Sequence, residues 1–442
     1  MENILDVTIE SYDSNGYGVA HVNKKVIFIP KALKDEKVKV KIINDHKKYA
    51  FAEIVSFINK SPLRIEEECP YASYCGGCDF FHMPYDIESQ IKEDSVKMTL
   101  REIKDFEFLP IKNALEIYKY RNKVMIPFCK DDEDDIIYGF YEKNSHKVVS
   151  IDKCLISDDL SNEITHFIER YLSLFHISIY NEEKHEGLFK ELMIRHTKTG
   201  EYMVVLVLTK EYDFSDLKDK LIEYYPEIKS IYININELKT NVVLSNNFKL
   251  IFGKKTILED ILGLKFEVHP SSFLQINHDQ CERLYTEALN MIELNNNMKV
   301  IDAYCGIGTI TLNIAKRVKE VIGIEVVEDA IINANRNKEL NNINNAKFIC
   351  GKCEDVIKDI ASKDKFDALF VDPPRKGCDR VFIDTIIDMR IPNIVYISCN
   401  PATMARDIKI LEEHGYKLKK VRPFDLFPRT NNIETVCLMA KK

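Results

Sequence analysis

The stretch VIDAYCGIGT, residues 300–309, decides the fold. Its apolar start is typical of a buried strand, and Gly306-x-Gly308 then leads into a helical pattern that continues to about residue 318. Glycines at such a strand-to-helix turn let the backbone approach a ligand closely. A lone Gly-x-Gly is weak evidence for a ligand site, so the segments that follow it have to support the interpretation.

Strands alternate with helices from about residue 256 to the end of the chain. The apolar runs EVIGIE (320–325), FDALFV (366–371) and NIVYIS (393–398) are separated by helical patterns. Buried, β-rich strands in this alternation indicate a parallel, doubly wound sheet. The sequence therefore predicts an α/β protein whose last domain, residues 256–442, has a Rossmann-like fold.

Acidic residues follow two of these strands. Glu325 comes 19 residues after Gly306, and an acid at about 20 residues commonly hydrogen-bonds ribose hydroxyls. A dinucleotide site also needs a third glycine, where this chain has Thr311, so the pattern favours S-adenosylmethionine. In FVDPPRKG (370–377), Asp372 precedes two prolines that make a stiff loop beside the crevice.

The cysteine of YISCNP (396–401) follows the next strand, so Cys399 opens onto the same crevice. Carbon C5 of uracil is too weak a nucleophile to attack a methyl sulfonium directly. A thiolate that adds to C6 makes an enolate that can, and a base must then remove the C5 proton. Asn400 could donate a hydrogen bond to the thiolate. Glu434 is the candidate base, although its local sequence fits a surface glutamate as well.

These motifs occur in the same order in a known enzyme family. The segments FLQIN, DAYCGIGT, FVDPPRKG, YISCNP and IETV resemble those of the RNA uracil-C5 methyltransferases. The resemblance implies that Cys399 is the nucleophile and Glu434 the base. It also implies that S-adenosylmethionine is bound by Gln275, Tyr304, Glu325 and Asp372. The family usually has histidine where this chain has Asn432, which leaves the role of that histidine unassigned.

A cysteine-rich segment lies far upstream of these motifs. Cys69, Cys75 and Cys78 are spaced like the ligands of one metal site, and Cys154 follows at a distance. Four thiolates suit zinc and an iron–sulfur cluster equally well. The segment resembles the site of the family branch that modifies 23S rRNA, which implies a [4Fe–4S] cluster.

The first half of the chain predicts two further domains. Residues 1–60 contain short strands broken by glycine and proline, which predicts a small β-barrel; it resembles the TRAM domain of the same family. Residues 61–255 have mixed α/β patterns and predict a central RNA-binding domain that carries the cysteines. Lys119, Arg121 and Lys123 alternate along a possible strand, so we expect one basic face toward RNA.

Composition limits the partners and the location. The net charge of −8 argues against a uniformly basic nucleic-acid binder, but it leaves room for a local basic face. No apolar stretch is long enough to span a membrane, and the start lacks the pattern of a secretion signal. We therefore expect a cytoplasmic protein with no membrane association and no obligate protein partner.

Together these features predict the transfer of a methyl group to C5 of a specific uridine in 23S rRNA through a covalent adduct between Cys399 and uracil C6. The uridine is flipped out of its stack, because the reacting carbons are otherwise out of reach. Three alternatives stay open: the same chemistry on tRNA, a non-catalytic RNA-binding assembly factor that keeps the fold, and a small-molecule methyltransferase.

Overall fold

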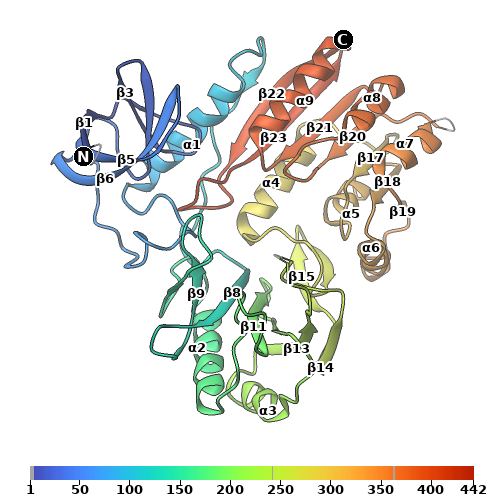
Figure 1. The fold of residues 1–442 in the computed structure, drawn as a ribbon. Helices are drawn as coiled ribbons and strands as arrows, with labels where there is room; N and C mark the ends of the chain where they lie inside the picture. Colours follow the sequence, from blue (N-terminus) through green and yellow to red (C-terminus); the bar gives the residue numbers. More distant parts are fainter. Residues whose placement is uncertain (1–3, 241, 362–363) are drawn as a thin grey trace.

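The structure is a computed structural model that describes residues 4–240, 242–361 and 364–442. These residues form sheets of six, seven, two and eight strands. Figure 1 shows the first sheet beside the C-terminal one, and the seven-stranded sheet below both. None of the helices in these ranges combines the length and the apolarity that a membrane crossing needs.

The N-terminal sheet has the strands that the sequence predicts for a small barrel. They run in the order β1-β5-β6-β4-β3-β2 and enclose an apolar core that includes Val7, Ile27 and Val38. Alternate residues of β5 are buried, as expected of a sheet with one face toward a core. The strands are β1 (Ile4–Thr8), β2 (Ser11–Tyr12), β3 (Gly18–Val22), β4 (Lys25–Ile29), β5 (Lys37–Asp45) and β6 (Tyr49–Asn59).

The middle of the chain forms the seven-stranded sheet in the order β10-β9-β8-β11-β12-β13-β14. Helices α2 (Asp159–Leu174) and α3 (Ser215–Tyr224) cover one face, where Ile164, Ile168 and Leu172 of α2 reach the core at helical spacing. The strands are β8 (Lys123–Lys130), β9 (Ile136–Tyr141), β10 (Val148–Ser150), β11 (Phe189–His196), β12 (Tyr202–Leu208), β13 (Ile228–Ile235) and β14 (Phe248–Gly253). Hairpin β15 (Ile257–Ile261) and β16 (Leu264–Val268) packs on the other face.

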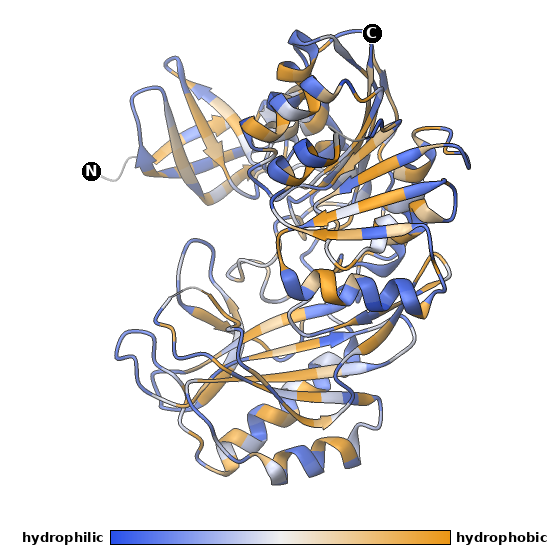
Figure 2. Cartoon of the chain, turned by 90° about the vertical axis from the view of Figure 1, so that its right-hand side faces the viewer, coloured by the Kyte–Doolittle hydropathy of each residue, from blue (hydrophilic) through white to orange (hydrophobic). Residues whose placement is uncertain are grey.

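The C-terminal sheet is the predicted doubly wound sheet, in the order β19-β18-β17-β20-β21-β23-β22-β7. Strands β17 to β21 pair in parallel, and β23 pairs antiparallel with β21. Figure 2 shows stretches of hydrophobic residues along the strands of the molecule. The strands are β17 (Lys299–Ala303), β18 (Glu320–Glu325), β19 (Ala346–Cys350), β20 (Ala368–Val371), β21 (Asn393–Ser398), β22 (Tyr416–Phe424) and β23 (Glu434–Lys441).

Helices cover both faces of this sheet because neighbouring strand residues point in opposite directions. Val300 packs in one core with α4 and α5, whereas Ile301 packs in the other with α7, α8 and α9. The helices are α4 (His278–Asn290), α5 (Thr309–Ala315), α6 (Glu328–Leu340), α7 (Cys353–Ala361), α8 (Arg380–Met389) and α9 (Pro401–Glu413).

A segment from the middle of the sequence completes the C-terminal sheet. Strand β7 (Glu107–Phe108) pairs with β22 and forms the edge of the sheet, and Val96 of α1 (Tyr85–Thr99) lies in the core beside α9. A helical pattern shows which face of a helix is apolar, but not which sheet that face covers. The division into 1–60, 61–255 and 256–442 stays a prediction.

Candidate functional site

Three of the predicted cofactor residues lie side by side at the carboxyl ends of parallel strands. The register pairs Ala303 with both Ile324 and Val371, so the next residues, Tyr304, Glu325 and Asp372, are level with one another. Ligands of open α/β sheets bind in the crevice at this edge. The strand alternation predicted this place for Glu325 and Asp372, the resemblance added Tyr304, and the register places all three at one edge.

The turn after β17 has a backbone that few residues other than glycine adopt. Gly306 and Gly308 have φ of 54° and 86°, and a Cβ on Gly308 would lie 2.8 Å from the Phe348 ring. The amide of Gly306 donates to Oε2 of Glu325 at 3.2 Å. The turn therefore fixes the glutamate beside the glycine backbone, where it can meet the hydroxyls of a ligand.

Gln275 belongs to none of these strands and lies on the loop that enters α4. It is buried, and its carbonyl oxygen accepts a hydrogen bond from Nδ2 of Asn122 at 2.9 Å. Asn277, two residues on, caps α4 and donates to the carbonyl of Leu426 at 3.2 Å. The FLQIN segment thus joins the middle sheet to the loop that precedes β23.

Cys399 and Glu434 face each other across an antiparallel strand pair. The register pairs Ser398 with Thr435, so the next residue of one strand, Cys399, stands opposite the previous residue of the other, Glu434. Directly opposite Cβ atoms are about 4.5–5.5 Å apart in such pairs. Cys399 is half-buried and Glu434 is buried. Oε2 of Glu434 has no hydrogen-bond partner among the described residues.

The charges around this pair oppose ionisation. Burial, followed by Glu434 and Asp372, raises the pKa of Cys399 to about 11, and Arg375 opposes the rise. Burial and Asp372 hold the pKa of Glu434 well above its usual range. Burial also raises the pKa of Asp372 to about 7. A cation that enters this site would lower the pKa values of all three groups, and so would favour the thiolate and the carboxylates over their protonated forms.

Two polar residues beside the pair have roles that the sequence did not indicate. Asn400, expected to donate to the thiolate, instead caps α9 by accepting from Ala402, and its amide donates to the carbonyl of Arg375 at 3.1 Å. Oδ1 of Asn432 accepts from Arg375 at 3.3 Å. Asn432 therefore holds the guanidinium of Arg375, which lowers the pKa of the thiol, so the side chain of Asn432 contributes indirectly.

The four predicted cysteine ligands line one cavity. Cys69, Cys75, Cys78 and Cys154 surround it together with Arg121 and apolar side chains. Burial, and then the other three thiols, raise the pKa of Cys78 well above its usual value, which shows that the sulfurs are close. Within the described ranges, however, no three or more His, Cys, Asp or Glu side chains are arranged to hold a metal ion.

The expected basic face does not form as a strand face. Only Lys123 lies in β8, where burial lowers its pKa to about 7. Lys119 is exposed and pairs with Asp159, and Arg121 faces the cysteine cavity. The three side chains diverge because the chain leaves strand geometry before Lys123, with a φ of 52° at Lys119.

Comparison with known proteins assigns the family. Residues 84–442 match the tRNA (uracil-5-)-methyltransferase family, and residues 3–55 match the TRAM domain. The chain belongs to the tRNA (uracil-5-)-methyltransferase family. The resemblance drawn from the motifs is thereby confirmed, as is the predicted fold of TRAM barrel and methyltransferase sheet. The four-cysteine site is the one element of that fold prediction for which the comparisons offer no support.

Relatives of this methyltransferase span almost its whole length. An uncharacterized RNA methyltransferase of Halalkalibacterium halodurans is 38% identical, covering 99% of this chain and 97% of its own. One from Staphylococcus epidermidis is also 38% identical over 99% and 96%. The solved Pyrococcus abyssi tRNA (uracil-54, C5)-methyltransferase, in complex with S-adenosyl-L-homocysteine, superposes with a TM-score of 0.80 at 27% identity, covering 99% of this chain and all of that one.

Family membership makes the protein an RNA methyltransferase that depends on S-adenosylmethionine.

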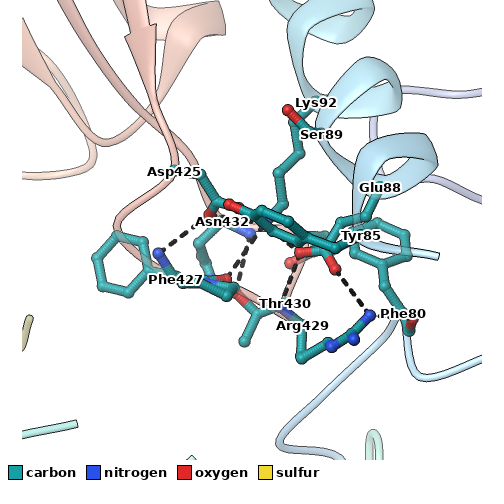
Figure 3. Close-up of polar contacts among 12 residues, drawn as sticks. Phe80, Tyr85, Glu88, Ser89, Lys92, Asp425, Phe427, Arg429, Thr430 and Asn432 are labelled. Carbon is teal, nitrogen blue, oxygen red and sulfur yellow. Dashed lines mark hydrogen bonds and ion pairs between the residues drawn. The ribbon is translucent and has the colours of Figure 1, made fainter. Parts of the chain in front are cut away.

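The part of the site that could not be predicted from the sequence lies around the loop 425–433, between β22 and β23. Figure 3 shows its contacts with α1, among them those of Lys92 and Arg429. The local sequence marks neither residue as buried, because lysine and arginine side chains are ordinarily solvated.

Proposed function

We propose that this methyltransferase methylates C5 of a flipped-out uridine in 23S rRNA, with Cys399 as nucleophile and Glu434 as base. The observation that supports these roles is their register: the thiol and the carboxyl stand opposite each other at the edge of the sheet where Asp372 also ends its strand. A thiolate that attacks C6 and a base that takes the proton from C5 must lie close together, because the two carbons are bonded to each other.

The reaction would proceed in four balanced changes. The thiolate of Cys399, its proton already lost, bonds to C6, and the C5–C6 π electrons move to form an enolate. C5 then takes the methyl group as the S–CH3 bond of the cofactor breaks, leaving S-adenosylhomocysteine. Glu434 removes the C5 proton. The S–C6 bond breaks, the C5–C6 double bond returns, and the thiolate leaves.

The raised pKa values of Cys399 and Glu434 mean that both groups must lose a proton before they can react. The thiol needs positive charge nearby to ionise, which Arg375 supplies in part and the cofactor sulfonium supplies further when bound. The carboxylate of Glu434, once ionised, is a strong base because its surroundings stabilise the protonated form. Gln275, Tyr304, Glu325 and Asp372 would hold the cofactor.

The choice of 23S rRNA as substrate rests on the four cysteines, because they resemble the cysteine site of the family branch that modifies 23S rRNA. Four thiols around one cavity are a donor set that suits a [4Fe–4S] cluster or zinc. We propose a [4Fe–4S] cluster held by Cys69, Cys75, Cys78 and Cys154, with a structural role. Protein purified without oxygen should be brown and contain iron; stoichiometric zinc without iron would overturn this assignment.

A tRNA substrate is the second candidate. It is favoured by the similarity to the Pyrococcus abyssi enzyme, which is named for uridine 54 of tRNA. Mass spectrometry of rRNA and tRNA from a deletion strain separates the two, since only the true substrate loses 5-methyluridine. A cytoplasmic location and the absence of an obligate protein partner stay predictions.

The catalytic roles are tested with trapped RNA. RNA that carries 5-fluorouridine lacks the C5 proton, so wild-type enzyme should stay covalently attached to it. Cys399→Ala should form no adduct and no product, whereas Glu434→Gln should form the adduct with ordinary RNA and release it slowly. Methylation by the Cys399→Ala variant would falsify the mechanism.

A further inference from the structure

A buried cluster of four charges joins α1 to the loop 425–433 (Figure 3). Nζ of Lys92 lies 2.8 Å from Oε1 of Glu88 and 2.9 Å from Oδ1 of Asp425. Arg429 adds the second cation, with its guanidinium 3.5 Å from Oε2 of Glu88. All four side chains are at most 4% exposed, so two cations and two anions neutralise one another away from water.

The cluster fixes the backbone of the loop as well as its side chains. The third N–H of Lys92 donates to the carbonyl of Phe427 at 3.2 Å, which uses all three ammonium donors. The amide of Arg429 donates to Oε1 of Glu88 at 2.7 Å. Arg429 has a φ of 69°, a left-handed conformation that costs about 1–2 kcal/mol in an ordinary residue. Glu88 therefore holds a strained turn of the loop in place.

Other elements bind the remaining backbone groups of the loop. The carbonyl of Arg429 accepts from the amide of Asp79 at 2.7 Å, and Oδ2 of Asp79 accepts from the amide of Asn431 at 3.0 Å. Tyr120 donates to the carbonyl of Pro428 at 2.9 Å. The loop is thus held along its length, and it ends one residue before Glu434.

A buried ion cluster is weak evidence for stability. The cost of removing charges from water often equals or exceeds their attraction, and apolar residues of similar size stabilise a core at least as well. What charged hydrogen bonds supply is fixed direction. Here the charged hydrogen bonds fix the orientation of a loop that carries Asn432 and leads into the proposed base, Glu434.

We propose that Lys92 and Glu88 are positioning residues for methyl transfer, which hold the loop 425–433 so that Glu434 faces Cys399. The inference rests on the proposed roles of Cys399 and Glu434. It predicts a specific defect: Cys399 follows β21 (Asn393–Ser398) and lies outside the loop, so proton removal from C5 should slow more than attack on C6.

The test compares Lys92→Met with Lys97→Met, an exposed lysine on the same helix. A double variant, Lys92→Met with Asp425→Asn, removes one charge of each sign and keeps the cluster neutral, so we expect it to fold even where the single variant does not. Three quantities are measured for each: binding of S-adenosylhomocysteine, the rate of adduct formation with 5-fluorouridine RNA, and the rate of release from ordinary RNA.

Lys97→Met should match the wild type in all three measurements. The Lys92 variants should bind S-adenosylhomocysteine within about twofold of wild type. Their attack on 5-fluorouridine RNA should slow less than their release does, although Asn432 of the same loop holds Arg375 near the thiol. Their release from ordinary RNA should slow by about tenfold or more, because a small misplacement of a catalytic group has that effect. The adduct should then accumulate on ordinary RNA, which loss of folding alone does not produce.

Two results would overturn the inference. One is release at the wild-type rate by the double variant. The other is a parallel fall in binding, attack and release, which would show that Lys92 only stabilises the fold. A wild-type enzyme that forms no adduct overturns the proposed function together with this inference, whereas normal wild-type behaviour beside normally releasing variants overturns the inference alone.

Discussion

The ionisation of Cys399 gives the sharpest test of the site. Burial, Glu434 and Asp372 raise its pKa to about 11, against about 8.5 for an exposed thiol. At pH 8 the thiolate fraction is then about one in a thousand, compared with about one in four for the exposed thiol. The difference in reactive form is roughly two hundredfold in the absence of RNA and cofactor.

The higher basicity of the Cys399 thiolate offsets part of this difference in thiolate fraction. A thiolate of higher pKa is more nucleophilic, with a Brønsted coefficient of about 0.4–0.5, which returns roughly tenfold. Cys399 should therefore react with iodoacetamide roughly twentyfold more slowly than an exposed thiol at pH 8. The exposed Cys350 of the same protein is the reference.

Mass spectrometry of the two peptides across pH 7–10 measures both rates. The alkylation rate of Cys399 should rise about tenfold for each pH unit throughout, whereas that of an exposed thiol levels off above about pH 9. Arg375→Gln should slow Cys399 further, because it removes the charge that lowers the pKa of the thiol. A plateau below pH 8 would refute the reasoning, since the thiolate would already be stable in the free enzyme.

Other predictions concern stability and the glycine turn. Burial raises the pKa of Asp302 to about 7, so the folded protein holds this proton more tightly than the unfolded chain, and stability falls as pH rises from about 4 to 7, by up to about 1.4 kcal/mol per pH unit. Asp302→Asn should remove this slope in urea denaturation, and parallel profiles for the two proteins would contradict it. Gly308→Ala should cost about 1–3 kcal/mol and weaken S-adenosylhomocysteine binding, because left-handed backbone strain adds to the contact with Phe348. Gly263→Ala has a similar φ and open space, so a matching loss there would show that the contact is unimportant.

Much of the methyltransferase domain could be predicted from local patterns. Apolar strands that alternate with helices indicate a parallel sheet, and residues that follow such strands meet at one edge. Glu325 and Asp372 could therefore be grouped before their register was known, and the family resemblance added Tyr304. Their spacing along the chain, and the motif order, also led to the correct family.

Other parts depended on contacts between distant segments. The alternation of Lys119, Arg121 and Lys123 suggested a strand face, but the chain takes a left-handed turn first. Asn400 looked like a donor to the thiolate and is a helix cap, because a strand-to-helix turn satisfies its side chain locally.

The sequence by itself determined the fold class, which follows from periodicity, and the family, which follows from the order of its motifs. It also made Cys399 and Glu434 the candidate nucleophile and base. Only the tertiary structure decided that Cys399 and Glu434 stand opposite each other, and that Lys92 neutralises Asp425, 333 residues further along the chain. Strand pairing and buried charge pairing join segments with no fixed separation in sequence, so no local pattern encodes them.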